Sequence, residues 1–250
     1  MKPWPGARGW LAATALLVTG LLLGTAARAD TTTTWAATAS NPPGGDGPVN
    51  AQAQITESSG KITVVLTNLE VNPTGAGQEI SGILISFGSP LSSQTPSMAS
   101  ESGTLININS GGSYSVANGA TITHWGASFS SSTDALCLAS ADGGPVSCGP
   151  STSPYDLIIG PPGPKNLYSN ANSSITGRNP QIQDAATFVL MMSGIQSTTQ
   201  ITGVQFQFGT PDFVISGHKV PGPVVGAGVP GLFAACGGLI AWLRRRRKTG

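Results

Sequence analysis

Side chains able to do chemistry are few in this chain of 250 residues, and they are widely spaced. His124 and His218 are the two histidines, and neither has a second ligand at a metal-binding spacing. The carboxylates are scattered too: Glu57 falls at a predicted turn and Asp184 before a predicted strand, and no pair stands out as a glycosidase acid and nucleophile. We therefore expect no enzymatic activity, no cofactor and no metal.

Two of the three cysteines, Cys137 and Cys148, flank a turn-rich loop that contains Asp142-Gly143-Gly144-Pro145. In an exported chain such a pair more often forms a disulfide than a metal site or a nucleophile, so we predict a Cys137–Cys148 bond. Closing so small a loop contributes on the order of 2–3 kcal/mol in the chain-entropy model. Cys236 lies in an apolar C-terminal run, where its ordinary role is that of a small buried residue.

Three aromatic residues, Trp125, Tyr155 and Tyr168, offer the one candidate for a ligand surface. Side by side on an exposed face they would form a stacking platform for sugars, as in a carbohydrate-binding module. The competing interpretation is that they pack in the core, and we favour it.

The elements that must position these residues have the pattern of β-strands. Ala51, Ala53 and Ile55 alternate with polar residues, a Ser-Ser-Gly turn follows, and residues 61–67 return as a second strand, which together predict a β-hairpin. Further strands are predicted between Gly, Pro and Asn residues at 80–87, 104–109, 114–125, 155–159, 186–192, 200–208 and 213–215.

No segment between the two ends shows a convincing helical period, so the predicted fold class is all-β. Short strands separated by Gly, Pro and Asn residues favour a single antiparallel β-sandwich over residues 49–219. The pattern does not distinguish an immunoglobulin-like from a jelly-roll topology. Residues 30–48 contain Asn41-Pro42-Pro43-Gly44-Gly45, which breaks any element, and we expect that segment to be flexible.

The two ends of the chain have the composition of targeting segments. Residues 1–29 carry Lys2 and Arg8 before an apolar run, and Ala27-Arg28-Ala29 predicts signal-peptide cleavage before Asp30. Near the other end, residues 224–243 are uncharged, and 20 helical residues span about 30 Å, the thickness of a bilayer core. A basic stop-transfer run follows at once, made of Arg244, Arg245, Arg246, Arg247 and Lys248.

The exported part and the two ends differ in the sign of their charge. Between the two targeting segments the chain keeps Lys61, Lys165, Arg178 and Lys219 against 11 acidic residues, a formal charge of −7. An acidic body repels phosphate backbones, so nucleic acid is not an expected partner. The arginine run lies directly behind the apolar stretch and is interpreted as a topology signal.

Taken whole, residues 220–250 resemble the sorting signals of PEP-CTERM proteins, in which a short proline motif precedes an apolar helix and an arginine cluster. The candidate motif is Val220-Pro221-Gly222-Pro223, with Gly222 where that family usually has glutamate. The resemblance implies that an exosortase-like membrane peptidase removes the tail, and that the protein passes to the cell surface or its polysaccharide matrix.

The body is also similar to uncharacterised exported proteins that carry such tails, and that resemblance implies no known activity. We therefore expect a structural or adhesive surface protein that is anchored in the membrane at least transiently. The alternatives are a single-pass membrane protein that keeps its helix, and a carbohydrate-binding module. The segments that carry this resemblance are 51–69 with Asn72-Pro73, 77–82, 124–126, 157–162, 168–172 and 204–210.

Overall fold

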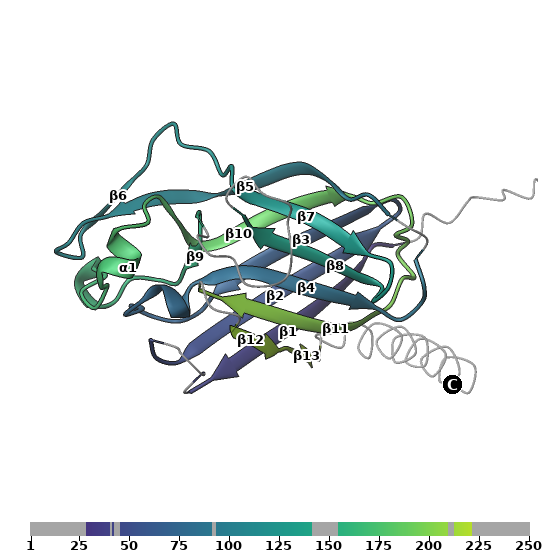
Figure 1. Cartoon of the computed structure of the whole chain (residues 1–250), viewed down its shortest axis with the longest axis horizontal. Coiled ribbons are helices and arrows are strands. Elements are labelled where there is room, and N and C mark those ends of the chain that lie inside the picture. The colour runs from purple at the N-terminus through teal and green to yellow at the C-terminus, as the bar shows by residue number, and fades with distance from the viewer. Residues whose placement is uncertain are drawn as a thin grey trace, which may run out of the picture.

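A computed structural model describes residues 29–40, 42, 46–91, 94–141, 155–209 and 213–221, and in these ranges the chain is mostly β-sheet (Figure 1). The strands are β1 (Thr31–Ala39), β2 (Val49–Ser58), β3 (Lys61–Asn68), β4 (Ile80–Phe87), β5 (Ser97–Ile108), β6 (Tyr114–Val116), β7 (Trp125–Ser130), β8 (Ala135–Ser140), β9 (Ile158–Ile159), β10 (Gln181–Met191), β11 (Ile201–Phe208), β12 (Phe213–Ser216) and β13 (His218–Val220). The short helices are η1 (Ala76–Gln78), η2 (Pro164–Asn166) and α1 (Ser173–Thr176).

Hydrogen bonding joins these strands into one sheet with two antiparallel runs. The first run has the order β5-β10-β3-β2-β1, and the second has the order β11-β4-β8-β7. The two-residue strand β9 connects the runs, because it pairs antiparallel with β4 and parallel with β10. The sheet is therefore mixed, and the prediction of a purely antiparallel sheet is wrong at this one pair.

The last two strands, β12 and β13, join the outer edges of the two runs. We call this junction the closed seam. β12 pairs with β11 at the end of the second run, and one residue later β13 pairs with β1 at the end of the first run. Thr34 lies opposite Val220, so the strand that begins the described domain is the neighbour of the strand that ends it. Both ends of the domain therefore lie on the closed seam.

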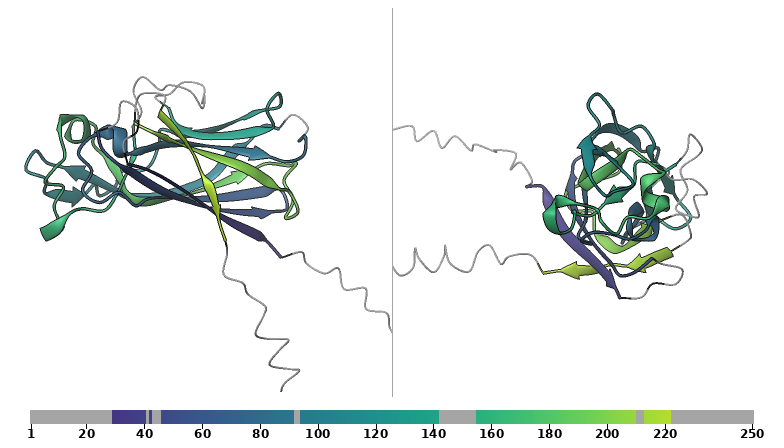
Figure 2. Two further views of the ribbon diagram at one scale, coloured as in Figure 1. Left: turned by 90° about the horizontal axis from the view of Figure 1, so that it is seen from below. Right: turned by 90° about the vertical axis from the view of Figure 1, so that its left-hand side faces the viewer.

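The other edge strands of the two runs are β5 and β7, and we call the region between them the open seam. β5 pairs with β10, and from Ser97 to Thr104 its other edge has no partner strand among the described residues. β7 pairs with β8 on one edge, and its other edge is likewise unpaired in the described chain. Figure 1 and the right view of Figure 2 place β5 and β7 on one side of the molecule and β1, β12 and β13 on the opposite side.

The main apolar core lies between the runs, and a second, smaller cluster consists of Ile106, Ile108, Ile159, Tyr168 and Ile175. Every second residue of β3 is buried, as expected for a strand with one face on the core. The same core cluster includes Leu66 and Phe188 of the first run and Ile85 and Phe206 of the second. The rings of Phe188 and Trp125 lie 4.6 Å apart, so the strands beside the open seam meet inside the molecule although their edges do not pair.

The predicted hairpin and the strand at 80–87 are confirmed, since β2 and β3 pair across Ser58 and Lys61 and β4 has the predicted bounds. Strands predicted at 186–192, 200–208 and 213–215 are confirmed with shifted ends. The predicted strand at 114–125 is wrong over 117–124, which is a loop that separates β6 from β7. β8 was not predicted, because all six of its residues are buried and it shows no alternation.

The prediction of a flexible segment at 30–48 is wrong for residues 31–39, which form β1. Four threonines have high β-propensity, and Trp35 and Ala37 are buried two residues apart, which is the period of a strand. β1 lies between β2 and β13, so its edges are paired on both sides. The folded domain therefore extends over residues 31–220 and is longer at its beginning than the predicted 49–219.

Among the described residues, no helix is long and apolar enough to cross a membrane. The predicted span at 224–243 and the basic run behind it lie outside the described residues, as does the signal peptide up to residue 28. These predictions remain predictions.

Candidate functional site

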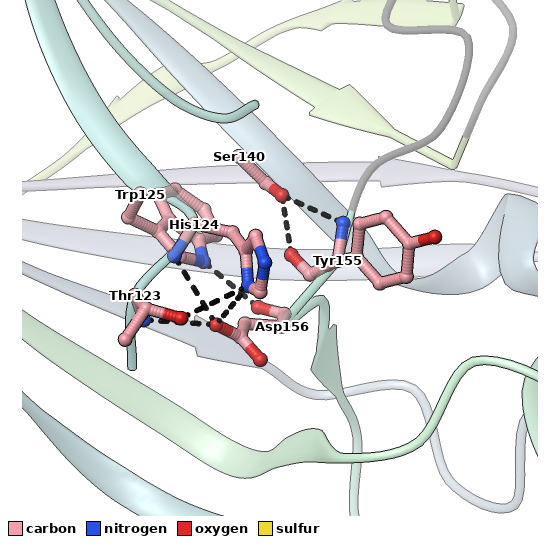
Figure 3. Close-up of polar contacts among 6 residues, drawn as sticks. All are labelled: Thr123, His124, Trp125, Ser140, Tyr155 and Asp156. Atoms are coloured by element: carbon pink, nitrogen blue, oxygen red, sulfur yellow. Dashed lines mark hydrogen bonds and ion pairs between the residues drawn. The ribbon is translucent and has the colours of Figure 1, made fainter. Parts of the chain in front are cut away.

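The structure brings together residues that sequence reasoning did not connect. His124, which ends the loop before β7, lies against Asp156, 32 residues later in the segment that leads into β9 (Figure 3). His124 Nδ1 is 2.9 Å from Asp156 Oδ2, and the carboxylate belongs to a residue that is only 2% exposed. A buried carboxylate on an imidazole nitrogen fixes the orientation of the ring.

Backbone groups complete the contacts of this carboxylate. The amide of Thr123 donates to Asp156 Oδ2 at 3.0 Å, and the amide of His124 donates to the same oxygen at 3.3 Å. Asp156 has a φ of +52°, a conformation in which Asp and Asn are over-represented. Its side chain thereby ties the loop before β7 to the segment before β9.

Trp125 and Ser140 hydrogen-bond to the backbone of residues 155 and 156. Trp125 Nε1 donates to the carbonyl oxygen of Asp156 at 2.8 Å, and the Ser140 hydroxyl donates to the carbonyl oxygen of Tyr155. The amide of Tyr155 donates back to Ser140 Oγ at 3.0 Å, and the ring of Tyr155 lies 5.0 Å from that of His124 (Figure 3). The cluster is therefore held from three separate segments of chain.

The geometry does not make a hydrolase triad. The Thr123 hydroxyl lies 3.2 Å from His124 Nδ1, the nitrogen that already faces Asp156, and the Ser140 hydroxyl is engaged with the backbone of Tyr155. A triad needs its nucleophile on the ring nitrogen opposite the carboxylate. What these contacts do is position a loop beside the open seam.

A cavity of about 340 Å³ opens beside this loop. Its lining comes from the unpaired stretch of β5 and from the loop before His124, and consists of Ser100, Glu101, Ser102, Gly103, Ala120, Thr121 and Ile122. Burial raises the pKa of Glu101, and the negative charge of Asp156 raises it further. The Glu101 carboxyl is therefore within the electrostatic reach of the Asp156 cluster.

Two other carboxyl groups are more deeply buried, and neither is at the cavity. Burial raises the pKa of Glu57 to about 7 against the opposing charge of Lys219, and both of its carboxyl oxygens lack a hydrogen-bond partner. Burial raises the pKa of Glu79 to about 8, and its carboxyl oxygens are also unpartnered. Glu57 lies in β2 and not in the turn where it was predicted, because it continues the inward-facing alternation of that strand.

The three aromatic residues do not form a stacking platform, which was the less favoured of the two interpretations. Trp125 is 7% exposed and packs on Phe188, and Tyr168 is fully buried, with its hydroxyl donating to the carbonyl oxygen of Gly160 at 3.0 Å. The preferred core interpretation is confirmed for these two residues. Tyr155 is 38% exposed and stands beside His124 instead.

The other predicted site residues are only partly within the described chain. Cys137 lies in β8 between Ser128 and Leu84, whereas Cys148 lies outside the described residues, so the predicted disulfide remains a prediction. Val220 ends β13 and Pro221 follows it on the surface, and the motif residues Gly222 and Pro223 lie beyond the described chain.

His218 is in β13 and is exposed. The described residues contain no group of three or more His, Cys, Asp or Glu that could hold a metal ion.

Sequence reasoning passed over Asp156 because nothing in its local sequence distinguishes it from the other scattered acids. The Tyr155-Asp156 pair before an apolar Leu-Ile-Ile segment was visible, but its partner is 32 residues away and depends on the sheet topology. Comparison with known proteins adds no constraint, since no family model, curated protein or solved structure matches this chain.

Proposed function

We propose that this chain is an exported surface or extracellular-matrix protein of structural or adhesive type, sorted through a C-terminal PEP-CTERM-like tail. Its exported body is a β-sandwich of immunoglobulin-like or jelly-roll kind, in which the two antiparallel runs form the two layers. Its partners are the membrane, an exosortase-like peptidase and extracellular polysaccharide. The protein is not an enzyme on this proposal, and it takes no cofactor.

The observation that carries the proposal is the position of the candidate motif. Val220 is the last residue of β13, which pairs with β1, and Pro221 is exposed directly behind it. A peptidase that cuts within or after residues 220–223 would therefore meet its substrate at the surface, and would leave all 13 strands in the mature product.

The closed seam also suggests how the domain is presented. A tail that leaves from β13 holds the molecule by its closed seam, and the open seam with its cavity is on the opposite side (Figure 2). A tethered domain with its recessed polar surface turned away from the attachment is the arrangement that an adhesive surface protein needs.

The test is the intact mass of the mature protein, taken separately from the membrane and extracellular fractions of its host. We expect the mature mass to begin near Asp30 and to end near residue 223 in the extracellular fraction. A variant in which Pro221 and Pro223 are both replaced by alanine should accumulate in the membrane with its tail intact. A wild-type mass that still includes Arg244 to Gly250 in every fraction would overturn sorting and leave the alternative, a membrane-anchored β-domain.

A further inference from the structure

The two edge strands of the open seam differ in how they are protected against pairing. A free strand edge exposes backbone N–H and C=O groups to other chains, and proteins commonly protect it with a bulge, a proline or an inward-facing charge. β5 has two of these features in its unpaired stretch. Ala99 is a bulge residue without a partner in β10, and Glu101, opposite the buried Phe188, is turned toward the core.

β7 has none of these features. Its six residues include no charge and no proline. Its register with β8 runs without a shift from Trp125, opposite Ser140, to Ser130, opposite Ala135, so β7 has no bulge. The other edge of β7 has no partner strand among the described residues and is therefore open to an added strand.

The hydrogen bonds to β8 show which backbone groups lie on this free edge. The amide of Ala141 donates to the carbonyl oxygen of His124, and these residues continue the register of β7 with β8. In an antiparallel pair, residues that exchange hydrogen bonds alternate with residues that do not. The N–H and C=O groups that point away from β8 are therefore those of Trp125, Ala127 and Phe129.

We propose that β7 pairs antiparallel with β7 of a second copy of this chain, about a two-fold axis at Ala127. In this register Ala127 lies opposite its own symmetry mate, and Trp125 lies opposite Phe129 of the second copy. Every residue whose backbone groups point to the free edge then has a hydrogen-bonding partner. A two-fold contact closes on itself, so the assembly is a dimer and not a filament.

Side chains and charge favour a second copy as the occupant. Ala127 and Phe129 are half-buried and pack against the main core, and an added strand would cover more of their surface. The register places an aromatic residue opposite an aromatic residue, which is a stabilising cross-strand pair. Two exported bodies with a formal charge of −7 repel each other, and β7 offers them an uncharged contact. Pairing does not require removal of the tail, so this inference stands or falls separately from the proposed function.

The experiment is sedimentation velocity of the full-length chain over a range of protein concentrations, in a non-denaturing detergent because residues 224–243 are apolar. We expect a monomer–dimer equilibrium. Ala127→Pro removes the N–H group at the centre of the proposed contact and no hydrogen bond to β8, so it should raise the dissociation constant of the dimer about tenfold or more. Both Ala127→Pro and its control keep the apolar tail, so association through the tail would persist in both.

The matched control is Ala99→Pro, which makes the same exchange at the edge of β5, at the residue that has no partner in β10. It should change the dissociation constant by less than about twofold. Hydrogen exchange of the unaltered protein provides a measurement that does not depend on how a variant folds. The amides of Ala127 and Phe129 should exchange more slowly at high protein concentration, whereas those of residues 100–104 should not change.

Three results would overturn the proposal. The first is a wild-type chain that stays monomeric at roughly 0.1 mM. The second is association that Ala127→Pro leaves intact, or that Ala99→Pro weakens as much as Ala127→Pro does. The third is exchange at Ala127 and Phe129 that does not vary with protein concentration.

Discussion

The two seams of the sheet are built from similar strands and differ in how their edges are satisfied. At the closed seam β12 and β13 hydrogen-bond to β11 and β1, so backbone pairing joins the runs. At the open seam the edges of β5 and β7 stay unpaired in the described chain, and the runs meet through the side chains of Trp125 and Phe188.

A glycine within the closed seam marks a close approach of the chain. A side chain at Gly217, between β12 and β13, would come within 2.9 Å of the Phe206 ring and 3.3 Å of the Val204 carbonyl oxygen. The open seam instead leaves a cavity beside the stretch of β5 that has no partner strand among the described residues. The comparison teaches that backbone pairing joins the runs at one seam and side-chain packing alone joins them at the other, and the following predictions test that division.

Removal of the bridging strands should have the largest effect. A chain that ends at Asp212 loses β12 and β13, including Phe213, which is buried and packs 6.0 Å from Phe208. We expect the free energy of unfolding to fall by more than the about 4 kcal/mol that one buried phenylalanine contributes. Urea unfolding followed by circular dichroism measures it, with a chain that ends at Pro223 as the control. Equal midpoints for the two chains would contradict the role given to the closed seam.

The stability of the domain should fall as the pH rises from about 5 to 8. The fold favours the protonated forms of Glu57 and Glu79, whose pKa values it raises from 4.5 to about 7 and about 8. Below pH 4.5 the folded and unfolded chains both hold these protons; above it the unfolded chain ionises first, and the penalty grows until the folded pKa is reached. For Glu57, which lies opposite Thr31 beside the closed seam, the penalty is about 3 kcal/mol.

Glu57→Gln should remove most of its share of this pH dependence, as measured by urea midpoints at pH 5 and pH 8. Glu101→Gln at the open seam is the comparison: burial raises the pKa of Glu101 too, but Glu101 is less buried than Glu57, so this variant should remove a smaller share of the pH dependence. A profile that is equally steep in the wild type and in Glu57→Gln would show that Glu57 is not the responsible group.

Gly217→Ala should destabilise the domain by about 1–3 kcal/mol, because the added methyl group overpacks the closed seam against Phe206 and Val204. Gly111→Ala provides the comparison, since a side chain there meets no atom within 4 Å. Thermal unfolding of the two variants measures the difference. If both shift the midpoint by the same small amount, the closed seam has room that the packing does not indicate.

The smallest effect is expected at the open seam. Asp156→Asn keeps a residue type that tolerates the positive φ but removes the charge that faces His124, at a cost of about 1 kcal/mol. Urea midpoints of the variant and of the wild type measure the difference. An unchanged midpoint would show that the Asp156–His124 contact does not stabilise the domain.

Local pattern was enough to predict several strands. The alternation in β2 and β3 with the turn between them predicted the hairpin, and the bounds of β4 follow from an apolar run between glycine and proline residues. These predictions succeeded because the side-chain period of a strand and the chemistry of a turn depend on neighbours in sequence. β1 was not predicted, although its alternation is visible in the sequence. The Pro-Gly segment at 42–45 predicted a flexible stretch, and that prediction was applied to all of residues 30–48.

By itself, then, the sequence determined an all-β body, its acidic charge and the spacing of its strands. Only the tertiary structure decided that β13 returns to β1, that Trp125 and Tyr168 are buried, and that Asp156 reaches His124. The physical reason is range: propensity and periodicity act over a few residues, whereas strand order and the partner of a buried carboxylate depend on contacts between segments far apart in the chain. The cavity at the open seam belongs to the second kind, since β5 and the loop before His124 line it together.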